Sequence, residues 1–155
     1  EAIQIELLDN QVRFQCGDTT IVSKVIDGKF PDYNRVIPLD NDKIFVINRA
    51  TLLGALERSA ILANEKFRGV RLQLAAGSLK ITCSNSEQEE ASEELEIAYA
   101  GESLEVGFNI QFLMDVLRSV SSDDIQLAFG DANRSTLITI PNNPEFKYIV
   151  MPMRI

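Results

Sequence analysis

The stretch Lys43-Ile44-Phe45-Val46-Ile47-Asn48-Arg49-Ala50-Thr51-Leu52-Leu53 changes from a strand pattern to a helix pattern within a few residues. Its first five residues are rich in β-branched and aromatic side chains, which favours a strand over residues 43–47. Asn48 is a good helix N-cap, and a helix is therefore expected from residue 49 to about residue 63.

The same order returns about 60 residues later, which indicates an internal duplication. A strand is expected over residues 104–108, an N-cap at Asn109 and a helix over residues 110–120. Three strand-like runs follow each helix, at 70–75, 79–83 and 94–99, and then at 125–129, 136–140 and 148–151. The pattern predicts an α+β fold built from duplicated β-α-β-β-β units.

Residues 1–26 resemble the last three strands of another such unit, with runs at 2–8, 11–16 and 19–25. Residues 27–42 interrupt regular structure with glycine, proline and aspartate and are the expected linker. We place a domain boundary near Asp32.

Composition excludes several classes of protein. The 155 residues are 45% hydrophobic and 25% charged, as in ordinary globular proteins. The chain has no histidine, which removes histidine-based nucleophile pairs and metal sites. No apolar run reaches the roughly 20 residues that span a bilayer, and the first residues lack signal-peptide features. Two cysteines are typical of reduced thiols, so a cytoplasmic protein is expected.

The helical projections assign core faces to both expected helices. Leu52, Leu53, Leu56, Ala60 and Ala63 form the core stripe of the first, and Phe112, Leu113, Val116, Leu117 and Val120 that of the second. Ile61 and Leu62 project away from the first stripe. They represent either ordinary scatter or a contact with another protein.

Charge is distributed unevenly in this chain of net charge −8. Residues 87–96 hold six glutamates, which are typical of a solvated strand edge, although a docking edge for a basic partner is the alternative. The run lacks the loop spacing of a calcium site. A group of five basic residues could lie over the phosphates of a nucleic acid, although such a group is weak evidence by itself. Its members are Arg49, Arg58, Lys66, Arg68 and Arg71.

The final residues, 148–155, are unusually apolar. They form either a last strand or an adaptable surface for partners, to which two methionines are suited. Phosphate-binding glycine loops are absent, and no nucleophile, base and orienting group assemble. An enzyme is therefore not expected, nor is a metal or cofactor.

Three segments carry a resemblance to a known family. Residues 23–33 (SKVIDGKFPDY), 64–72 (NEKFRGVRL) and 150–154 (VMPMR) closely resemble the bacterial DNA polymerase III β subunit, the sliding clamp. Shorter segments at 86–91 and 107–109 agree with it, in the same order along the whole chain. The resemblance implies the DNA-clamp fold, with helices on one side of antiparallel sheets.

The resemblance also implies a domain assignment and an assembly. Residues 1–32 would be the C-terminal half of the clamp's middle domain, and residues 33–155 its third domain. Members of the family form head-to-tail homodimeric rings around duplex DNA, with the helices lining the hole. The first domain and the front half of the middle domain would be absent from this chain.

Three sets of site residues follow from the resemblance. Clients such as the replicative polymerase, the clamp loader and repair proteins insert a short Gln-Leu-x-Leu-Phe-like peptide into a groove. The matching positions are Pro31, Arg35, Val36, Asn109, Phe112, Val150, Met151, Pro152, Met153, Arg154 and Ile155. Ring closure would use apolar Ile61 and Leu62 with acidic Glu87, Glu89, Glu90 and Glu93. Arg49, Arg58 and Arg118 would face the DNA backbone.

Some positions depart from the family pattern. Phe112 stands where many members have tyrosine, and Ile155 replaces a common leucine. Residues 130–146 form a longer loop than in familiar members, and no role is transferred to them. The sequence thus predicts a non-catalytic processivity factor. The alternative is a β-rich peptide-binding adaptor with no DNA role, which ring formation on circular DNA would exclude.

Overall fold

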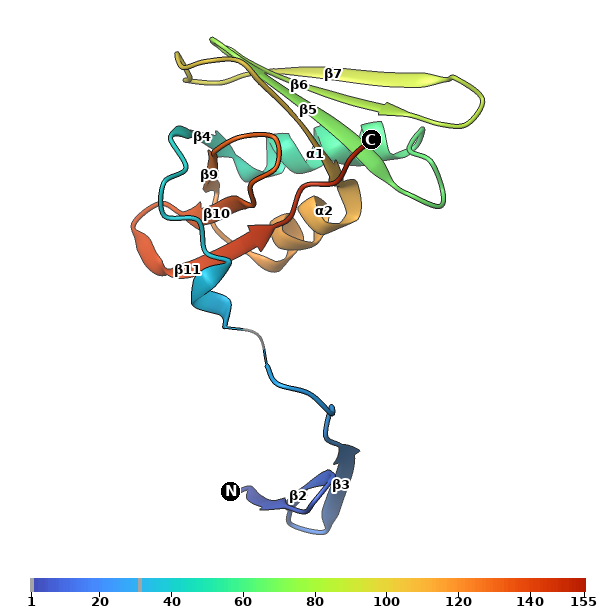
Figure 1. Cartoon of the computed structure of the whole chain (residues 1–155), viewed down its shortest axis with the longest axis vertical. Coiled ribbons are helices and arrows are strands. Elements are labelled where there is room, and N and C mark those ends of the chain that lie inside the picture. The colour runs from blue at the N-terminus through green and yellow to red at the C-terminus, as the bar shows by residue number, and fades with distance from the viewer. Residues whose placement is uncertain (1, 31) are drawn as a thin grey trace. The chain divides into compact units, whose positions relative to one another are not determined.

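The computed structural model describes residues 2–30 and 32–155 and divides into two compact units, Glu1–Asp32 and Tyr33–Ile155 (Figure 1). The first unit is an antiparallel sheet of β1 (Gln4–Leu7), β2 (Gln11–Cys16) and β3 (Thr19–Lys24), in that order. Large apolar side chains such as Ile5, Leu7 and Ile21 are exposed on it. Among the described residues of this unit, no second layer covers the sheet.

The second unit contains two successive β-α-β-β-β repeats, as the sequence predicts. The first is β4 (Lys43–Asn48), α1 (Arg49–Ala60), β5 (Gly69–Ala75), β6 (Ser78–Ser84) and β7 (Glu90–Glu96). The second is β8 (Leu104–Asn109), α2 (Ile110–Ser119), β9 (Asp124–Phe129), β10 (Thr136–Ile140) and β11 (Asn143–Val150). A short 3-10 helix, η1 (Tyr33–Arg35), precedes them. The predicted α+β class is confirmed.

Each sheet of this unit contains three strands of one repeat and one strand of the other. The four-stranded orders are β11-β10-β9-β4 and β7-β6-β5-β8, and every pairing is antiparallel. The first strand of each repeat therefore lies in the sheet of the other repeat. Both helices pack on one face of the sheets and against each other (Figure 1).

Asparagine side chains begin both helices, as predicted. The Asn48 Oδ1 accepts a hydrogen bond from the Thr51 amide at 3.0 Å, and the Asn109 Oδ1 accepts one from the Gln111 amide at 2.9 Å. Each bond satisfies an amide that lacks a partner within its helix. The predicted end of the first helix at residue 63 is too late, because residues 61–63 form single turns with i−3 carbonyls.

The core lies between the helices and the inner faces of both sheets. Phe108, Leu56, Leu79 and Ile81 are fully buried there. One predicted core residue is wrong: the Phe112 side chain is 53% exposed. On α2 the buried residues are Ile110, Leu113, Met114, Val116 and Leu117.

Two predicted strands begin earlier than expected. The strand predicted over 94–99 begins at Glu90, because charged residues are tolerated outward on an edge strand. The strand predicted over 148–151 begins at Asn143 despite Pro144. β11 is also an edge strand, where a missing amide is tolerated, and its pairing with β10 is irregular between Ile138 and Ile140. Residues 130–146 are therefore mostly strand rather than one loop.

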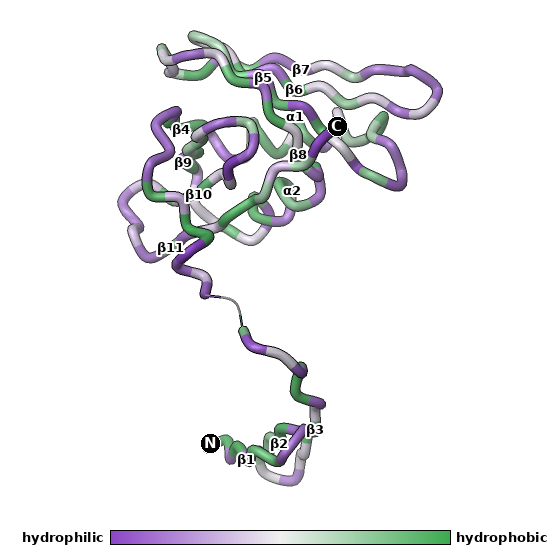
Figure 2. Tube along the Cα trace, viewed as in Figure 1, coloured by the Kyte–Doolittle hydropathy of each residue, from purple (hydrophilic) through white to green (hydrophobic). Residues whose placement is uncertain are grey.

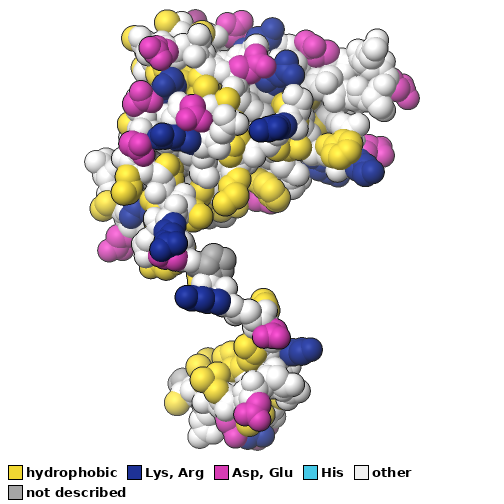
Figure 3. All heavy atoms as spheres, viewed as in Figure 1, with side chains coloured by type: hydrophobic (Ala, Val, Ile, Leu, Met, Phe, Trp, Pro, Cys, Tyr) yellow, Lys and Arg dark blue, Asp and Glu magenta, His cyan; other side chains and the backbone are white. Residues whose placement is uncertain are grey.

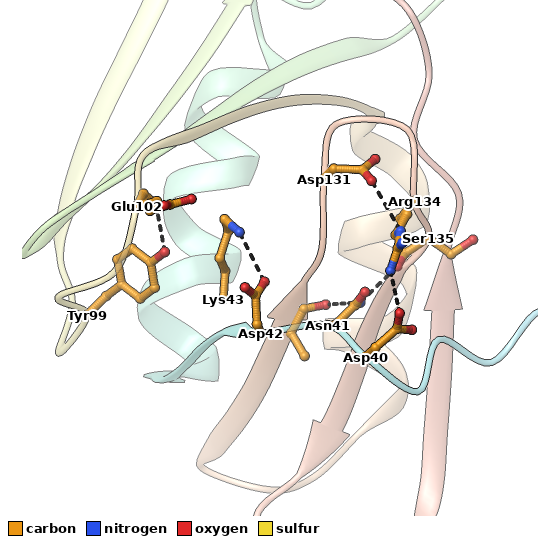
Figure 4. Close-up of polar contacts among 10 residues, drawn as sticks. Asp40, Asn41, Asp42, Lys43, Tyr99, Glu102, Asp131, Arg134 and Ser135 are labelled. Atoms are coloured by element: carbon orange, nitrogen blue, oxygen red, sulfur yellow. Dashed lines mark hydrogen bonds and ion pairs between the residues drawn. The ribbon is translucent and has the colours of Figure 1, made fainter.

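A polar network fixes the chain entering β4 (Figure 4). The Asn41 amide nitrogen donates to the carbonyls of Ala128 at 2.8 Å and Ser135 at 3.0 Å. Arg134 binds Asp40 at 2.8 Å and Asp131 at 3.1 Å, and these carboxylates raise the pKa of the guanidinium. The segment before β4 is thus held against the β9–β10 connection.

No helix in the described part of the chain is both long and apolar enough to cross a membrane. Over the same residues, acidic and cysteine side chains nowhere form a group of three that could hold a metal ion.

Candidate functional site

The terminal segment, residues 151–155, lies along the free edge of β8. The Met153 amide donates to the Gly107 carbonyl at 2.8 Å. Met153, Arg154 and Ile155 form part of the lining of a cleft of about 450 Å³, together with Phe67 and Arg71. The terminal segment is therefore held in place while its side chains remain accessible: Met151 is 61% exposed.

The end of β11 shows which side chains a ligand could reach. Val150 is only 1% exposed and belongs to the core, so its inclusion among the ligand-contacting side chains is wrong. Adjacent residues of a strand point to opposite faces, so the half-buried Ile149 faces outward instead. It lies opposite Leu137 on β10, another half-buried side chain.

Sequence reasoning missed Ile149 for an identifiable reason. Residues 149–151 are all apolar, so the run carries no alternation from which to read the inward face. The pairing of β10 with β11 supplies this information. Leu137 and Phe67 could not be found from the sequence either, because only the folded chain pairs Leu137 with Ile149 and brings Phe67 into the cleft with Met153 and Ile155.

Arg35 and Val36 lie in a second cleft. This cleft has a volume of about 600 Å³ and is also lined by Arg134 and Ser135, which the network of Figure 4 holds in place. Val36 is half-buried and its amide donates to the Tyr33 carbonyl at 3.1 Å. Pro31, a further member of the predicted set, lies outside the described residues.

The start of α2 holds the two remaining members of the set. The Asn109 side chain is engaged as the N-cap of α2, and Phe112 lies exposed within the first turn. Gly107, which binds the terminal segment, is two residues before Asn109 on β8. The structure thus brings Asn109 near the terminal segment, but the two clefts share no lining residue.

Hydrophobic side chains gather where β11 ends and α2 lies, on the face shown in Figure 3. Acidic and basic side chains are interleaved on this face rather than separated into patches. An apolar surface with scattered charges is better suited to a short peptide with apolar anchors than to a phosphate backbone.

The predicted interface residues lie at one end of α1 and along β7. Ile61 is 79% exposed, whereas Leu62 is half-buried. β7 is the edge strand of its sheet, and the hairpin that leads into it is hydrophilic (Figure 2). Glu87, Glu89 and Glu90 are exposed there. The strand-edge location of the acidic run is confirmed.

Glu93 differs from these other glutamates. Its carboxylate accepts two hydrogen bonds from Arg58, at 2.7 and 2.8 Å, and the bonded guanidinium lowers its pKa. It faces α1 rather than solvent and is half-buried. The Glu93 carboxylate is therefore less available to a basic partner than those of Glu87 and Glu89, because Arg58 already binds it.

The three arginines predicted to face DNA have partners within the domain. The Arg49 guanidinium donates to the carbonyls of Ser122 at 2.8 Å and Leu117 at 3.0 Å. It binds carbonyls at the end of α2, where a cation is favoured, so Arg49 has a structural role within the domain. Arg118 binds Glu57 at 2.8 Å and links the two helices, and Arg58 binds Glu93.

Comparison with known proteins agrees with this architecture. Residues 34–154 match the family model described as DNA polymerase III beta subunit, C-terminal domain. The chain is 48% identical to the beta sliding clamp of Pseudomonas putida and 40% identical to that of Escherichia coli, over 99% of this chain and 42% of each relative. The chain therefore spans about 42% of the length of these curated relatives.

Solved structures show the same relationship in three dimensions. The DNA polymerase III subunit beta from Pseudomonas aeruginosa superposes with a TM-score of 0.89 at 46% identity, over 99% of this chain and 42% of that one. The Caulobacter crescentus pol III beta has a TM-score of 0.89 at 38% identity, over 99% and 41%. The fold is that of a DNA polymerase sliding clamp. The chain belongs to the DNA polymerase III beta subunit family.

Proposed function

We propose that the chain is the C-terminal part of a sliding clamp that encircles duplex DNA and gives the replicative polymerase its processivity. Residues 33–155 would be the third domain and residues 1–32 the C-terminal half of the middle domain. The match to beta sliding clamps over 99% of the chain supports this assignment. The role is non-catalytic and is carried out in the bacterial cytoplasm.

The client-binding groove is proposed around the terminal segment. The observation that carries this proposal is the exposure of Phe112 on α2 and of Met151 next to the outward-facing Ile149, where α2 and β11 are in contact. These apolar side chains could receive the Leu and Phe anchors of a client peptide. The full set is Arg35, Val36, Asn109, Phe112, Ile149, Met151, Pro152, Met153, Arg154 and Ile155, with Pro31 retained from the sequence.

Relatives support a ligand-binding role for the family. Sliding clamps from Pseudomonas aeruginosa and Bartonella birtlesii have been solved bound to griselimycin. By analogy, the clients of this chain are a replicative polymerase, a clamp loader and repair proteins that present short linear peptides.

The ring interface is proposed at Ile61, Leu62, Glu87, Glu89 and Glu90. An open edge strand can pair with a strand of another subunit, and its exposed glutamates favour a basic partner. Arg58 and Arg118 are proposed to lie on the DNA side of the ring. Because both already bind carboxylates, they would attract the backbone only weakly, as sliding requires.

A nuclear magnetic resonance titration tests the groove. The 155-residue chain is titrated with the peptide Gln-Leu-Ser-Leu-Phe, and shifts are expected at Val36, Asn109, Phe112 and residues 149–155. Met153→Ala should weaken binding, whereas Ile26→Ala, at an exposed aliphatic residue outside the set, should not. Shifts confined to residues 87–93 or to α1 would contradict the assignment.

A further inference from the structure

Two glycines on the outer face of the β7-β6-β5-β8 sheet lie directly under the terminal segment. Gly69 on β5 and Gly107 on β8 are diagonal neighbours, because Gly69 pairs with Asn109 and Arg71 pairs with Gly107. Their sheet neighbours Val70 and Phe108 point into the core, so both glycines belong to the outer face. The Ile155 side chain lies over both of them.

The space above these glycines is filled by the terminal segment. A Cβ at Gly107 would lie 2.5 Å from the Met153 carbonyl oxygen and 2.6 Å from the Ile155 Cγ1. A Cβ at Gly69 would lie 2.9 Å from the Ile155 Cγ2. Neither glycine has a positive φ, so the lack of a side chain, rather than backbone conformation, is what the site requires.

The two clashes differ in kind. At Gly107 the obstructing atom is a backbone oxygen, and it belongs to the residue whose amide donates to the Gly107 carbonyl. A methyl group there must push the chain away from β8. At Gly69 the obstructing atom is a side-chain methyl group, Cγ2 of Ile155, and no backbone atom is close, so a rotation about χ1 or a small shift of Ile155 can relieve the contact.

We propose that Gly107, assisted by Gly69, is a positioning residue for the client-binding groove. The two glycines form a seat on which residues 153–155 lie, and this seat sets the place of Met153 relative to Ile149 and Phe112. The inference rests on the proposed function, because it assigns the seat to the groove. Gly107 acts through the terminal segment and need not touch the peptide.

Because Gly107 lies within a strand, the effect of replacing it with alanine can be predicted specifically. Alanine normally suits a strand better than glycine does, so Gly107→Ala would be neutral or stabilising if nothing lay above it. We expect the reverse. The Met153 amide of this variant should exchange with solvent faster than in the wild-type chain, because its hydrogen bond to residue 107 is broken.

Three variants of the 155-residue chain separate positioning from general destabilisation. Binding of fluorescein-labelled Gln-Leu-Ser-Leu-Phe is measured by anisotropy, Met153 amide exchange by nuclear magnetic resonance, and Tm by circular dichroism. Gly107→Ala should weaken peptide binding on the order of tenfold, because the groups that contact a ligand tolerate little displacement. Gly69→Ala should have a smaller effect of the same sign, and it remains informative if Gly107→Ala does not fold.

Gly101→Ala is the matched control. Its new Cβ would lie 2.5 Å from the Tyr99 hydroxyl oxygen and 2.7 Å from the ring, so it also clashes, but away from the terminal segment. It should lower Tm and leave peptide affinity and Met153 exchange unchanged.

The outcomes distinguish the two proposals. If the wild-type chain does not bind the peptide, the proposed function fails, and the role of the seat in it fails too. If the wild-type chain binds and Gly107→Ala binds equally well, or keeps Met153 protected, the positioning role alone is wrong. Equal loss of affinity in Gly101→Ala would also overturn it, because the effect would then reflect stability.

Discussion

Arg58 on α1 holds Glu93 on β7 through two parallel hydrogen bonds, Nε to Oε1 at 2.7 Å and Nη2 to Oε2 at 2.8 Å. The helix is thereby tied to the edge strand of the sheet. A bidentate arginine–carboxylate pair has fixed geometry as well as charge. Because both groups lie beside the proposed ring interface, the pair also sets how much negative charge that interface presents.

This pair predicts an acid-side loss of stability. The arginine lowers the Glu93 pKa below 4.5, so its contribution is complete above the unfolded value of 4.5 and is lost as pH falls through the lower folded value. Glu93→Gln should therefore lower Tm at pH 7, and the difference from the wild-type chain should shrink as pH falls below 4.5. Glu96→Gln, on the same strand outside the pair, is the control. A constant difference in Tm across the pH range would contradict the argument.

Truncation of Val150 and of Ile149, neighbours at the end of β11, should affect different properties of the chain. Val150→Ala removes two methyl groups from the core and should cost roughly 2 kcal/mol of unfolding free energy. Ile149→Ala should cost less stability and weaken peptide binding more. Urea unfolding and the anisotropy assay measure the two effects. If Val150→Ala had the larger effect on the peptide, the inward orientation of Val150 would be wrong.

The N-caps give a prediction that does not depend on function. Asn48→Ala removes the acceptor for the Thr51 amide and should cost about 1 kcal/mol of unfolding free energy. Asn48→Asp keeps an acceptor at the same place but loses the hydrogen bond that Nδ2 donates to the Asp123 carbonyl at 3.1 Å, so it should recover only part of that stability. Chemical denaturation measures both, and an alanine variant as stable as the aspartate variant would refute the cap.

Cys83 should be chemically inert in the folded chain. Burial raises the pKa of its thiol to about 11, so almost no thiolate exists at pH 8. Modification by iodoacetamide, followed by mass spectrometry of the peptide containing Cys83, should occur only when denaturant is added. Because the thiolate fraction rises towards pH 11, any native reactivity should increase with pH. Rapid labelling at pH 7 would show that Cys83 is accessible.

Binding of duplex DNA by this chain should be weak and independent of sequence. With Arg58 and Arg118 as the candidate phosphate contacts, the slope of log K against log salt should be shallow, about −2. Arg118→Gln should reduce the slope by about 1, whereas Lys147→Gln, on edge strand β11, should not. Fluorescence anisotropy over a salt series measures this. Tight, sequence-selective binding would exclude a sliding role.

The sequence predicted those features that depend on local chemistry. The asparagine caps and the strand-helix repeat are visible in short stretches of sequence. The β-α-β-β-β order could therefore be predicted directly. The Arg58–Glu93 pair could not be read, because its partners lie 35 residues apart and meet only when α1 packs on β7. Arg49 is a similar case, since its acceptors belong to the other repeat.

The site was predicted less completely than the fold. The resemblance identified the terminal segment, but the all-apolar run at 149–151 left its inward face undetermined. The glycine seat could not be recognised either. A glycine in a strand is ambiguous until the structure shows that another segment of chain occupies the space above it.

The exchange of strands between the two repeats makes them inseparable. β4 completes the sheet of the second repeat, and β8 completes the sheet of the first. A cut in the connection between β7 and β8 would leave each repeat with one helix and four strands. β5 would then lack its neighbour β8, and β9 would lack its neighbour β4. Neither half could then fold as an autonomous module, whereas the two together could reassemble by fragment complementation. The duplication visible in the sequence therefore corresponds to a single cooperative unit in the folded protein.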